Sequence, residues 1–184
     1  DGFQKKLGET LNLTRVSAPL FVLKSSGLND DLNGVERKVS FEAKDIKGEI
    51  EIVQSLAKWK RNALYVYGFQ EGEGLYTDMN AIRRDEELDN LHSLYVDQWD
   101  WEKVIRKEDR TLDYLFATVR KIYSCVLKEE AEINQKYSCF SEKLPSEITF
   151  LSTEELEEKY PTLSRKEREN VITREKKAVF LYHI

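Results

Sequence analysis

The apolar periodicity of residues 112–127 is the feature that most constrains the fold of this chain. Apolar side chains recur there at three- and four-residue steps, which is the spacing of one face of an α-helix. They are Leu112, Leu115, Phe116, Val119, Ile122, Tyr123, Val126 and Leu127. Charged side chains take the other face, and they are Asp113, Arg120, Lys121, Lys128 and Glu129. A long helix with one apolar face has to pack against another layer, so core packing explains it without any functional role.

Short segments with strand character predict the layer that faces this helix. Alternating side chains over residues 39–43 indicate a half-buried strand, and residues 49–53 return as the second strand of a hairpin. Residues 79–87 and 92–102 are predicted as two strands joined by a short turn, and residues 178–184 as a last apolar strand. Since hairpins build antiparallel sheets, the sequence predicts an α+β architecture, an antiparallel sheet flanked by helices.

Other helices are predicted from periodicity and from capping residues. Residues 3–11 form an amphipathic helix, and Ser55 is expected to cap a helix over residues 56–64. Two capping boxes open further helices near the end of the chain. These boxes are Ser152 with Glu155 and Ser164 with Glu167.

Composition limits the classes of partner. The 29 basic and 34 acidic side chains give a net charge of −5, which argues against nucleic acid held by bulk electrostatics but not against a local basic pocket. No apolar run approaches the roughly 20 residues that span a bilayer, so no membrane association is expected. Cys125 and Cys139 set no disulfide framework and no metal-ligand spacing, and Cys125 is expected to be a buried thiol. We therefore expect no metal site and a reducing, cytoplasmic setting.

The predicted strand from Leu94 to Glu102 carries charge on one face. Side chains alternate along a strand, so Gln98 and Asp100 share a face and lie about 7 Å apart. Tyr95, Trp99 and Trp101 fall on the opposite, mostly aromatic face, which suits a core. The polar face allows two readings, a solvated surface or the wall of a binding site, and alternation does not choose between them.

Basic residues at two other places allow the same two readings. Lys58, Lys60 and Arg61 lie within one helical turn and point in different directions, so one of them could enter an anion pocket. Strand alternation would send Arg83 and Arg84 to opposite faces, and the planar fork of arginine suits phosphate.

Several of these stretches resemble a known family. The segments SLAKWKR, GEGLYTDMNAIRRDE and LHSLYVDQWDWE, with DDLNG and AVFLYHI in the same order, are similar to the ammonia-dependent aspartate–ammonia ligases of the bacterial type. The resemblance runs from the first helix to the last residue.

The resemblance implies a fold and a reaction. The family's fold is similar to the catalytic domain of class II aminoacyl-tRNA synthetases, usually a homodimer, and residues 1–184 would form one such domain. The implied reaction uses ATP and Mg²⁺ to convert L-aspartate and ammonia to asparagine, AMP and pyrophosphate through a β-aspartyl adenylate. The first helix with RVSAP looks like the dimer-forming first motif, and AIRRDE with LYVDQWDWE looks like the ATP-binding second motif.

The same resemblance implies roles for individual residues. Arg83 is expected to bind the α-phosphate and to stabilise the charge that grows there. Lys60 is expected to bind a substrate carboxylate. Gln98 and Asp100 are expected to hold aspartate, with Asp100 facing its ammonium group.

Other positions are implied near the same substrates. Asp30 matches the family position near the amino acid and incoming ammonia, and Ser55 is a candidate for that pocket. Asp85 and Glu86 begin the loop over the nucleotide. His92 is either a nucleotide contact or a structural histidine at the end of a strand.

The sequence departs from the family pattern at its end. Family members continue through acidic metal-binding positions to a glycine-rich third motif, which is absent from residues 1–184. We therefore expect a longer parent chain, and no turnover by residues 1–184 alone. Two alternative functions stay open: a synthetase-like paralogue that binds aspartate or ATP without ligation, and a dimerisation module.

Overall fold

The computed structural model describes residues 2–183 of the chain. Contacts between Cα atoms divide the chain into two compact units, Asn12–Arg106 and Asp1–Leu11 with Lys107–Ile184, and each unit is described by itself. The prediction that the chain is a single catalytic domain stays a prediction.

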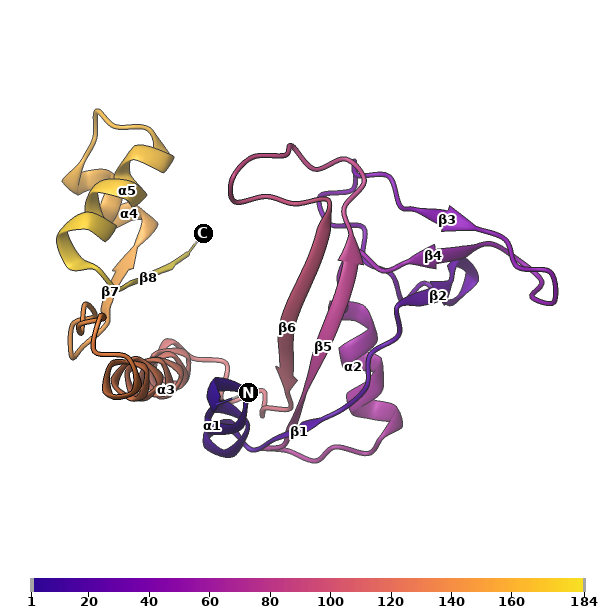
Figure 1. The fold of residues 1–184 in the computed structure, drawn as a ribbon, viewed down its shortest axis with the longest axis horizontal. Coiled ribbons are helices and arrows are strands. Elements are labelled where there is room, and N and C mark those ends of the chain that lie inside the picture. Colours follow the sequence, from indigo (N-terminus) through magenta and orange to yellow (C-terminus); the bar gives the residue numbers. More distant parts are fainter. Residues whose placement is uncertain (1, 184) are drawn as a thin grey trace. The chain divides into compact units, whose positions relative to one another are not determined.

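The unit Asn12–Arg106 is built around two long antiparallel strands, β5 (Gly74–Ile82) and β6 (Tyr95–Lys103). Strand β1 (Leu13–Arg15) pairs in parallel with β5 and completes this sheet. A second sheet has the order β2 (Phe21–Leu23), β4 (Ile50–Ile52) and β3 (Ser40–Phe41). Helix α2 (Ala57–Val66) lies beside β5 and β6 (Figure 1).

The core of this unit lies under one face of the long hairpin. The register places Thr77 opposite Asp100 and Met79 opposite Gln98, and directly opposed residues share a face. Met79 packs with Val53, Leu56 and Ala81 in a buried cluster at the beginning of α2. The face that carries Gln98 and Asp100 is therefore also the face that buries the core.

The aromatic face differs from its prediction. Tyr95 is 56% exposed, and Trp99 and Trp101 are only half-buried. Trp99 pairs with Tyr76 at 5.2 Å between ring centroids. The assignment of Tyr95 to the core is wrong, because alternation separates the two faces of a strand but does not tell which of them a helix covers.

The ends of the strands also differ from the predictions. β5 stops at Ile82, so Arg83 and Arg84 lie in the loop that follows, and the alternation argument does not apply to them. The predicted strand at residues 39–43 shrinks to the two exposed residues of β3, although its hairpin with β4 is confirmed. The structure assigns the N-cap of α2 to Leu56, while the Ser55 hydroxyl accepts from the Ala57 amide at 3.3 Å.

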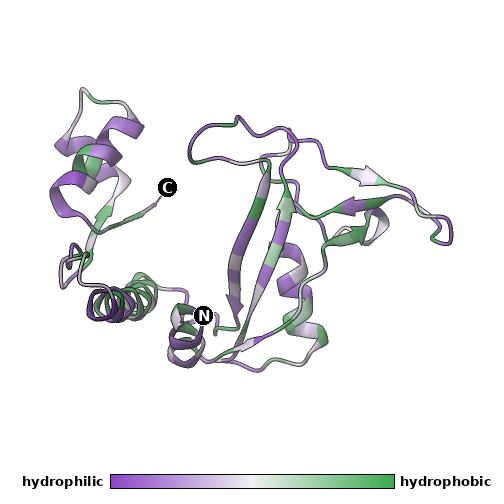
Figure 2. Cartoon of the chain, viewed as in Figure 1, coloured by the Kyte–Doolittle hydropathy of each residue, from purple (hydrophilic) through white to green (hydrophobic). Residues whose placement is uncertain are grey.

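The unit Asp1–Leu11 with Lys107–Ile184 contains the predicted long helix. Its elements are α1 (Gly2–Leu11), α3 (Leu112–Lys136), β7 (Thr149–Ser152), α4 (Thr153–Lys159), α5 (Arg165–Lys176) and β8 (Val179–Tyr182). α1 packs on α3, and hydrophobic and hydrophilic residues lie on different sides of α3 (Figure 2). Both predicted capping boxes are confirmed, and β7 pairs with β8 in parallel.

One prediction from composition is tested by the structure. Cys125 is fully buried, as expected, and its thiol donates to the Thr10 hydroxyl at 3.3 Å. Within residues 2–183, none of the helices combines the length and the apolar character needed to cross a bilayer. The cytoplasmic setting stays a prediction.

Candidate functional site

A buried ion pair joins α2 to β6. Lys60 Nζ lies 2.7 Å from Asp100 Oδ2, and the Lys60 side chain is only 4% exposed. The ammonium also donates to the Trp101 carbonyl at 3.1 Å and lies 3.7 Å from Glu102 Oε2. The structure thus brings together two residues, 40 positions apart, that the sequence assigned to one substrate.

The two ends of this pair differ in their access to water. Asp100 is 28% exposed and also accepts from the Trp101 amide at 2.9 Å. Lys60 is nearly enclosed, and a buried ammonium without an anion is costly. The sheet face at this point therefore presents a reachable carboxylate beside a cation held deeper in the unit.

We expect Asp100→Ala to destabilise the fold more than Lys60→Met does. Asp100→Ala leaves a buried ammonium with only Glu102 and the Trp101 carbonyl, at a cost of about 2 kcal/mol. Lys60→Met removes the buried charge and leaves a carboxylate that water reaches, so its cost is below about 1 kcal/mol. Urea unfolding of both variants measures the difference, and equal losses would contradict the burial asymmetry.

Arg83 lies in the wall of a cavity of about 430 Å³. Glu36, Gln54, Asp85 and Glu86 are among the other side chains that line it. The Arg83 guanidinium is held 3.6 Å from Glu86 Oε2, while its buried Nε–H has no hydrogen-bond partner among the described residues. This cavity is where the structure offers a guanidinium to an anionic ligand.

Asp85, which lines the cavity, is bonded to Arg37. Its carboxylate accepts from the Arg37 backbone amide at 2.7 Å, and the guanidinium reaches Asp85 Oδ1 at 2.5 Å. These hydrogen bonds with Arg37 lower the pKa of the Asp85 carboxyl to about 2. The expected nucleotide contact of Asp85 stays a prediction, and the observed contact fixes the loop after β5 to the segment before β3.

Arg37→Leu should bring the pKa of the Asp85 carboxyl back toward its ordinary value near 4, because the guanidinium bonds are lost. With the pKa lowered in the folded state, this pair stabilises the fold above about pH 4, and that contribution disappears as the pH falls through about 2. Carboxyl ¹³C chemical shifts, recorded against pH, measure the change. A pKa of about 2 that persists in the variant would exclude the Arg37 side chain as its cause.

Asp30 and Ser55, which the resemblance places in one pocket, are in direct contact. The Ser55 hydroxyl donates to Asp30 Oδ2 at 2.9 Å, and both residues are half-buried. This contact ties the long loop before β3 to the residue that precedes the N-cap of α2. Their roles near the amino acid and ammonia stay predictions.

His92 has contacts that suit the structural reading. It is exposed, and its Nδ1 lies 2.9 Å from Asp89 Oδ1, which also accepts from the His92 amide at 2.7 Å. The pKa of the Asp89 carboxyl falls to about 2, chiefly because of the Leu91 amide and then the His92 ring. Nucleotide contact by His92 stays a prediction.

Two residues near this cavity were missed from the sequence. Gln54 precedes Ser55 directly, and Arg37 sits in a stretch read only as loop. Neither carries a sequence signal of its own, because their importance comes from partners far away in the chain.

No group of three or more histidine, cysteine, aspartate or glutamate side chains within residues 2–183 is arranged to hold a metal ion. In the cavity, Glu36 accepts from the Asn33 amide, Asp85 is bonded to Arg37, and Glu86 faces Arg83. These carboxylates do not form a ligand set for Mg²⁺, which demands near-octahedral oxygen geometry.

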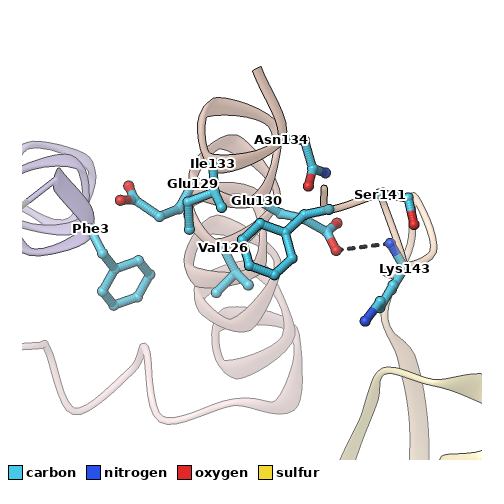
Figure 3. A pocket seen from close by; sticks show the side chains of 9 residues that line it. Phe3, Val126, Glu129, Glu130, Ile133, Asn134, Ser141 and Lys143 are labelled. Atoms are coloured by element: carbon cyan, nitrogen blue, oxygen red, sulfur yellow. Dashed lines mark hydrogen bonds between the residues drawn. The ribbon is translucent and has the colours of Figure 1, made fainter. Parts of the chain in front are cut away.

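A second cavity, of about 360 Å³, lies in the other unit. Phe3 from α1 and Val126 and Ile133 from α3 line it, and Glu130 accepts from the Lys143 amide at its edge (Figure 3). None of the residues assigned to substrates lines this cavity, so the candidate site is the one in Asn12–Arg106.

Comparison with solved structures defines the class of fold. The asparaginyl-tRNA synthetase of Pyrococcus horikoshii, complexed with asparaginyl-adenylate, matches 98% of this chain and 43% of its own, with a TM-score of 0.67 and 14% identity. The Entamoeba histolytica asparaginyl-tRNA synthetase matches 100% of this chain and 41% of its own, with a TM-score of 0.61 and 11% identity. The fold is α+β and of the class II aminoacyl-tRNA synthetase type.

Sequence comparison defines the family. The profile described as aspartate-ammonia ligase matches residues 1–184, and the chain belongs to that family. Aspartate–ammonia ligase of Clostridium tetani is 60% identical over 185 residues, which cover 100% of this chain and 54% of the relative. The enzyme of Lactobacillus johnsonii is 56% identical, covering 100% of this chain and 55% of the relative. The chain thus spans about half the length of these relatives.

Proposed function

We propose that the complete protein joins ammonia to the side-chain carboxylate of L-aspartate, using ATP and releasing AMP and pyrophosphate. The observation that carries the proposal is the buried Lys60–Asp100 pair, set on the same sheet face as Gln98. Membership of the aspartate-ammonia ligase family supports it.

The ion pair suits a ligand that carries both charges. Aspartate has an ammonium group and carboxylates, so it can insert with a carboxylate on Lys60 and its ammonium on Asp100. Each protein charge then keeps a partner of opposite sign, and one ion pair is replaced by two. Gln98 lies along the same face and supplies an amide that both donates and accepts.

Arg83 would act on the phosphate. The aspartate carboxylate attacks the α-phosphorus of ATP, and negative charge grows on the phosphoryl oxygens as pyrophosphate leaves. The Arg83 side chain is 33% exposed and lines the cavity, and its Nε–H has no partner among the described residues, so the guanidinium can turn to those oxygens at little cost in existing hydrogen bonds. The resulting acyl adenylate is attacked by ammonia, since AMP is a better leaving group than oxide.

Mg²⁺ would be bound with the phosphates of ATP, and the carboxylates that line this cavity form no ligand set for it within residues 2–183. We also propose that the complete protein is a homodimer, from the resemblance of α1 and the segment RVSAP (residues 15–19) to the first motif. Light scattering of the complete natural chain tests that assembly.

The test of the reaction uses the complete natural chain. Aspartate, ammonia, ATP and Mg²⁺ together should give asparagine and AMP in equal amounts. Omission of aspartate or of ammonia should abolish the formation of both products. Aspartate-dependent exchange of pyrophosphate into ATP, without ammonia, separates the ligase from a binding-only paralogue. A protein that gives neither products nor exchange is not this ligase.

A further inference from the structure

Gln54 lines the cavity beside Arg83, and its side chain carries a hydrogen-bond acceptor that has no partner among the described residues. The residue is completely buried, and its side-chain NH₂ group donates to the Arg37 carbonyl at 3.0 Å. Only the nitrogen of the amide can donate to a carbonyl, so this bond fixes which way the amide faces. Its Oε1 has no hydrogen-bond partner among the described residues, and Gln54 lines the cavity.

The backbone amide of Gln54 and the side chain of Asn29 beside it have hydrogen-bond partners. Its backbone amide donates to Asn29 Oδ1 at 2.9 Å, and Asn29 donates in turn to Glu51 and to the Ile52 carbonyl, both at 3.1 Å. Buried polar atoms are almost always paired, and a network that pairs its neighbours but leaves one oxygen open is unusual. The open oxygen therefore needs a donor from outside the described residues, either a water molecule or a ligand.

We propose that Gln54 Oε1 accepts an N–H hydrogen bond from the incoming ammonia and holds it for attack on the acyl adenylate. This inference rests on the proposed function. If Arg83 binds the α-phosphate, the activated carbonyl carbon is joined to that phosphorus through one oxygen. The cavity shared by Arg83 and Gln54 is then where the nucleophile has to arrive.

The acceptor is neutral, so it favours ammonium much less than a carboxylate would. A free carboxylate would stabilise NH₄⁺, which has no lone pair and cannot attack a carbonyl. An amide oxygen accepts one N–H of NH₃ and stabilises the protonated form less than a carboxylate does, and the lone pair stays available. The carboxylates that line the cavity are already engaged with Asn33, Arg37 and Arg83.

Amide formation exchanges one bond at the acyl carbon for another. The ammonia nitrogen forms a C–N bond to the acyl carbon, and the bond from that carbon to the phosphate oxygen breaks. AMP leaves with the electron pair, and one proton passes from nitrogen to water. Gln54 keeps its hydrogen bond to a nitrogen that stays bonded to the substrate, and it exchanges no proton.

Gln54→Met in the complete natural chain is the direct test, because methionine has nearly the same length and lacks the amide. We expect the KM for ammonia to rise roughly tenfold, as for the loss of about one hydrogen bond, with aspartate-dependent ATP–pyrophosphate exchange within about twofold of wild type. Gln70→Met, at an exposed loop glutamine, is the matched control and should change neither quantity.

Gln54→Glu is the second variant, should Gln54→Met fail to fold. It keeps an acceptor but adds a charge that favours ammonium, which cannot attack the acyl carbon, so kcat/KM for ammonia should fall while exchange is retained. A rise in the KM for aspartate, an equal fall of exchange and ligation, or unchanged kinetics would each overturn the inference. The proposed function fails separately, if the wild-type protein makes no asparagine.

Discussion

Lys60→Met in the complete natural chain is expected to raise the KM for aspartate by roughly 30- to 100-fold. A hydrogen bond between charged groups contributes about 2–3 kcal/mol, and each 1.4 kcal/mol is tenfold in affinity. The ammonium of Lys60 is enclosed on the sheet face that carries Asp100, so a substrate carboxylate that reaches it leaves little water to screen the pair.

The matched control lies two residues earlier on the same helix. Lys58→Met removes an ammonium that is 41% exposed and lies 2.9 Å from the exposed Asp31 carboxylate. Steady-state kinetics with aspartate as the varied substrate should show no more than about a twofold change for this control, because exposed ion pairs are worth little. Equal effects of Lys58→Met and Lys60→Met would remove the reason to assign Lys60 to the substrate.

Features that depend on spacing within one segment could be predicted from the sequence. Alternation placed Gln98 and Asp100 on one face, and the register of β5 and β6 confirms that they share it. The residues of α3 and the two capping boxes were predicted for the same reason, since each depends on spacing within one segment. The approach of Lys60 to Asp100 follows from the resemblance rather than from spacing, because the two residues belong to different elements.

What could not be predicted depends on contacts between distant segments. Alternation did not tell which face of β6 would meet α2, and Tyr95 was assigned to the core for that reason. The end of β5 at Ile82 was also missed, since the apolar and charged residues around it fit a strand or a loop equally well. Gln54 and the Arg37–Asp85 pair acquire meaning only when the loop before β3 folds back onto the cavity.

Arg83→Leu is expected to have the largest effect on adenylate formation, because it removes a donor placed where phosphoryl charge develops. Loss of one such donor lowers kcat by roughly 100- to 1,000-fold in comparable sites. Leucine retains part of the packing of the arginine stem, so the loss should appear in the rate of ATP–pyrophosphate exchange rather than in the stability of the fold.

Two companion variants make the test specific. Arg83→Lys keeps the charge but not the planar fork, and should recover only part of the lost rate. Arg106→Leu, at an exposed arginine that pairs with Glu71 at the end of β6, should leave exchange within about twofold of wild type. If Arg83→Leu exchanges pyrophosphate as fast as Arg106→Leu, the cavity beside Arg83 does not hold the α-phosphate, and the assignment of Gln54 to the nucleophile loses its geometric basis.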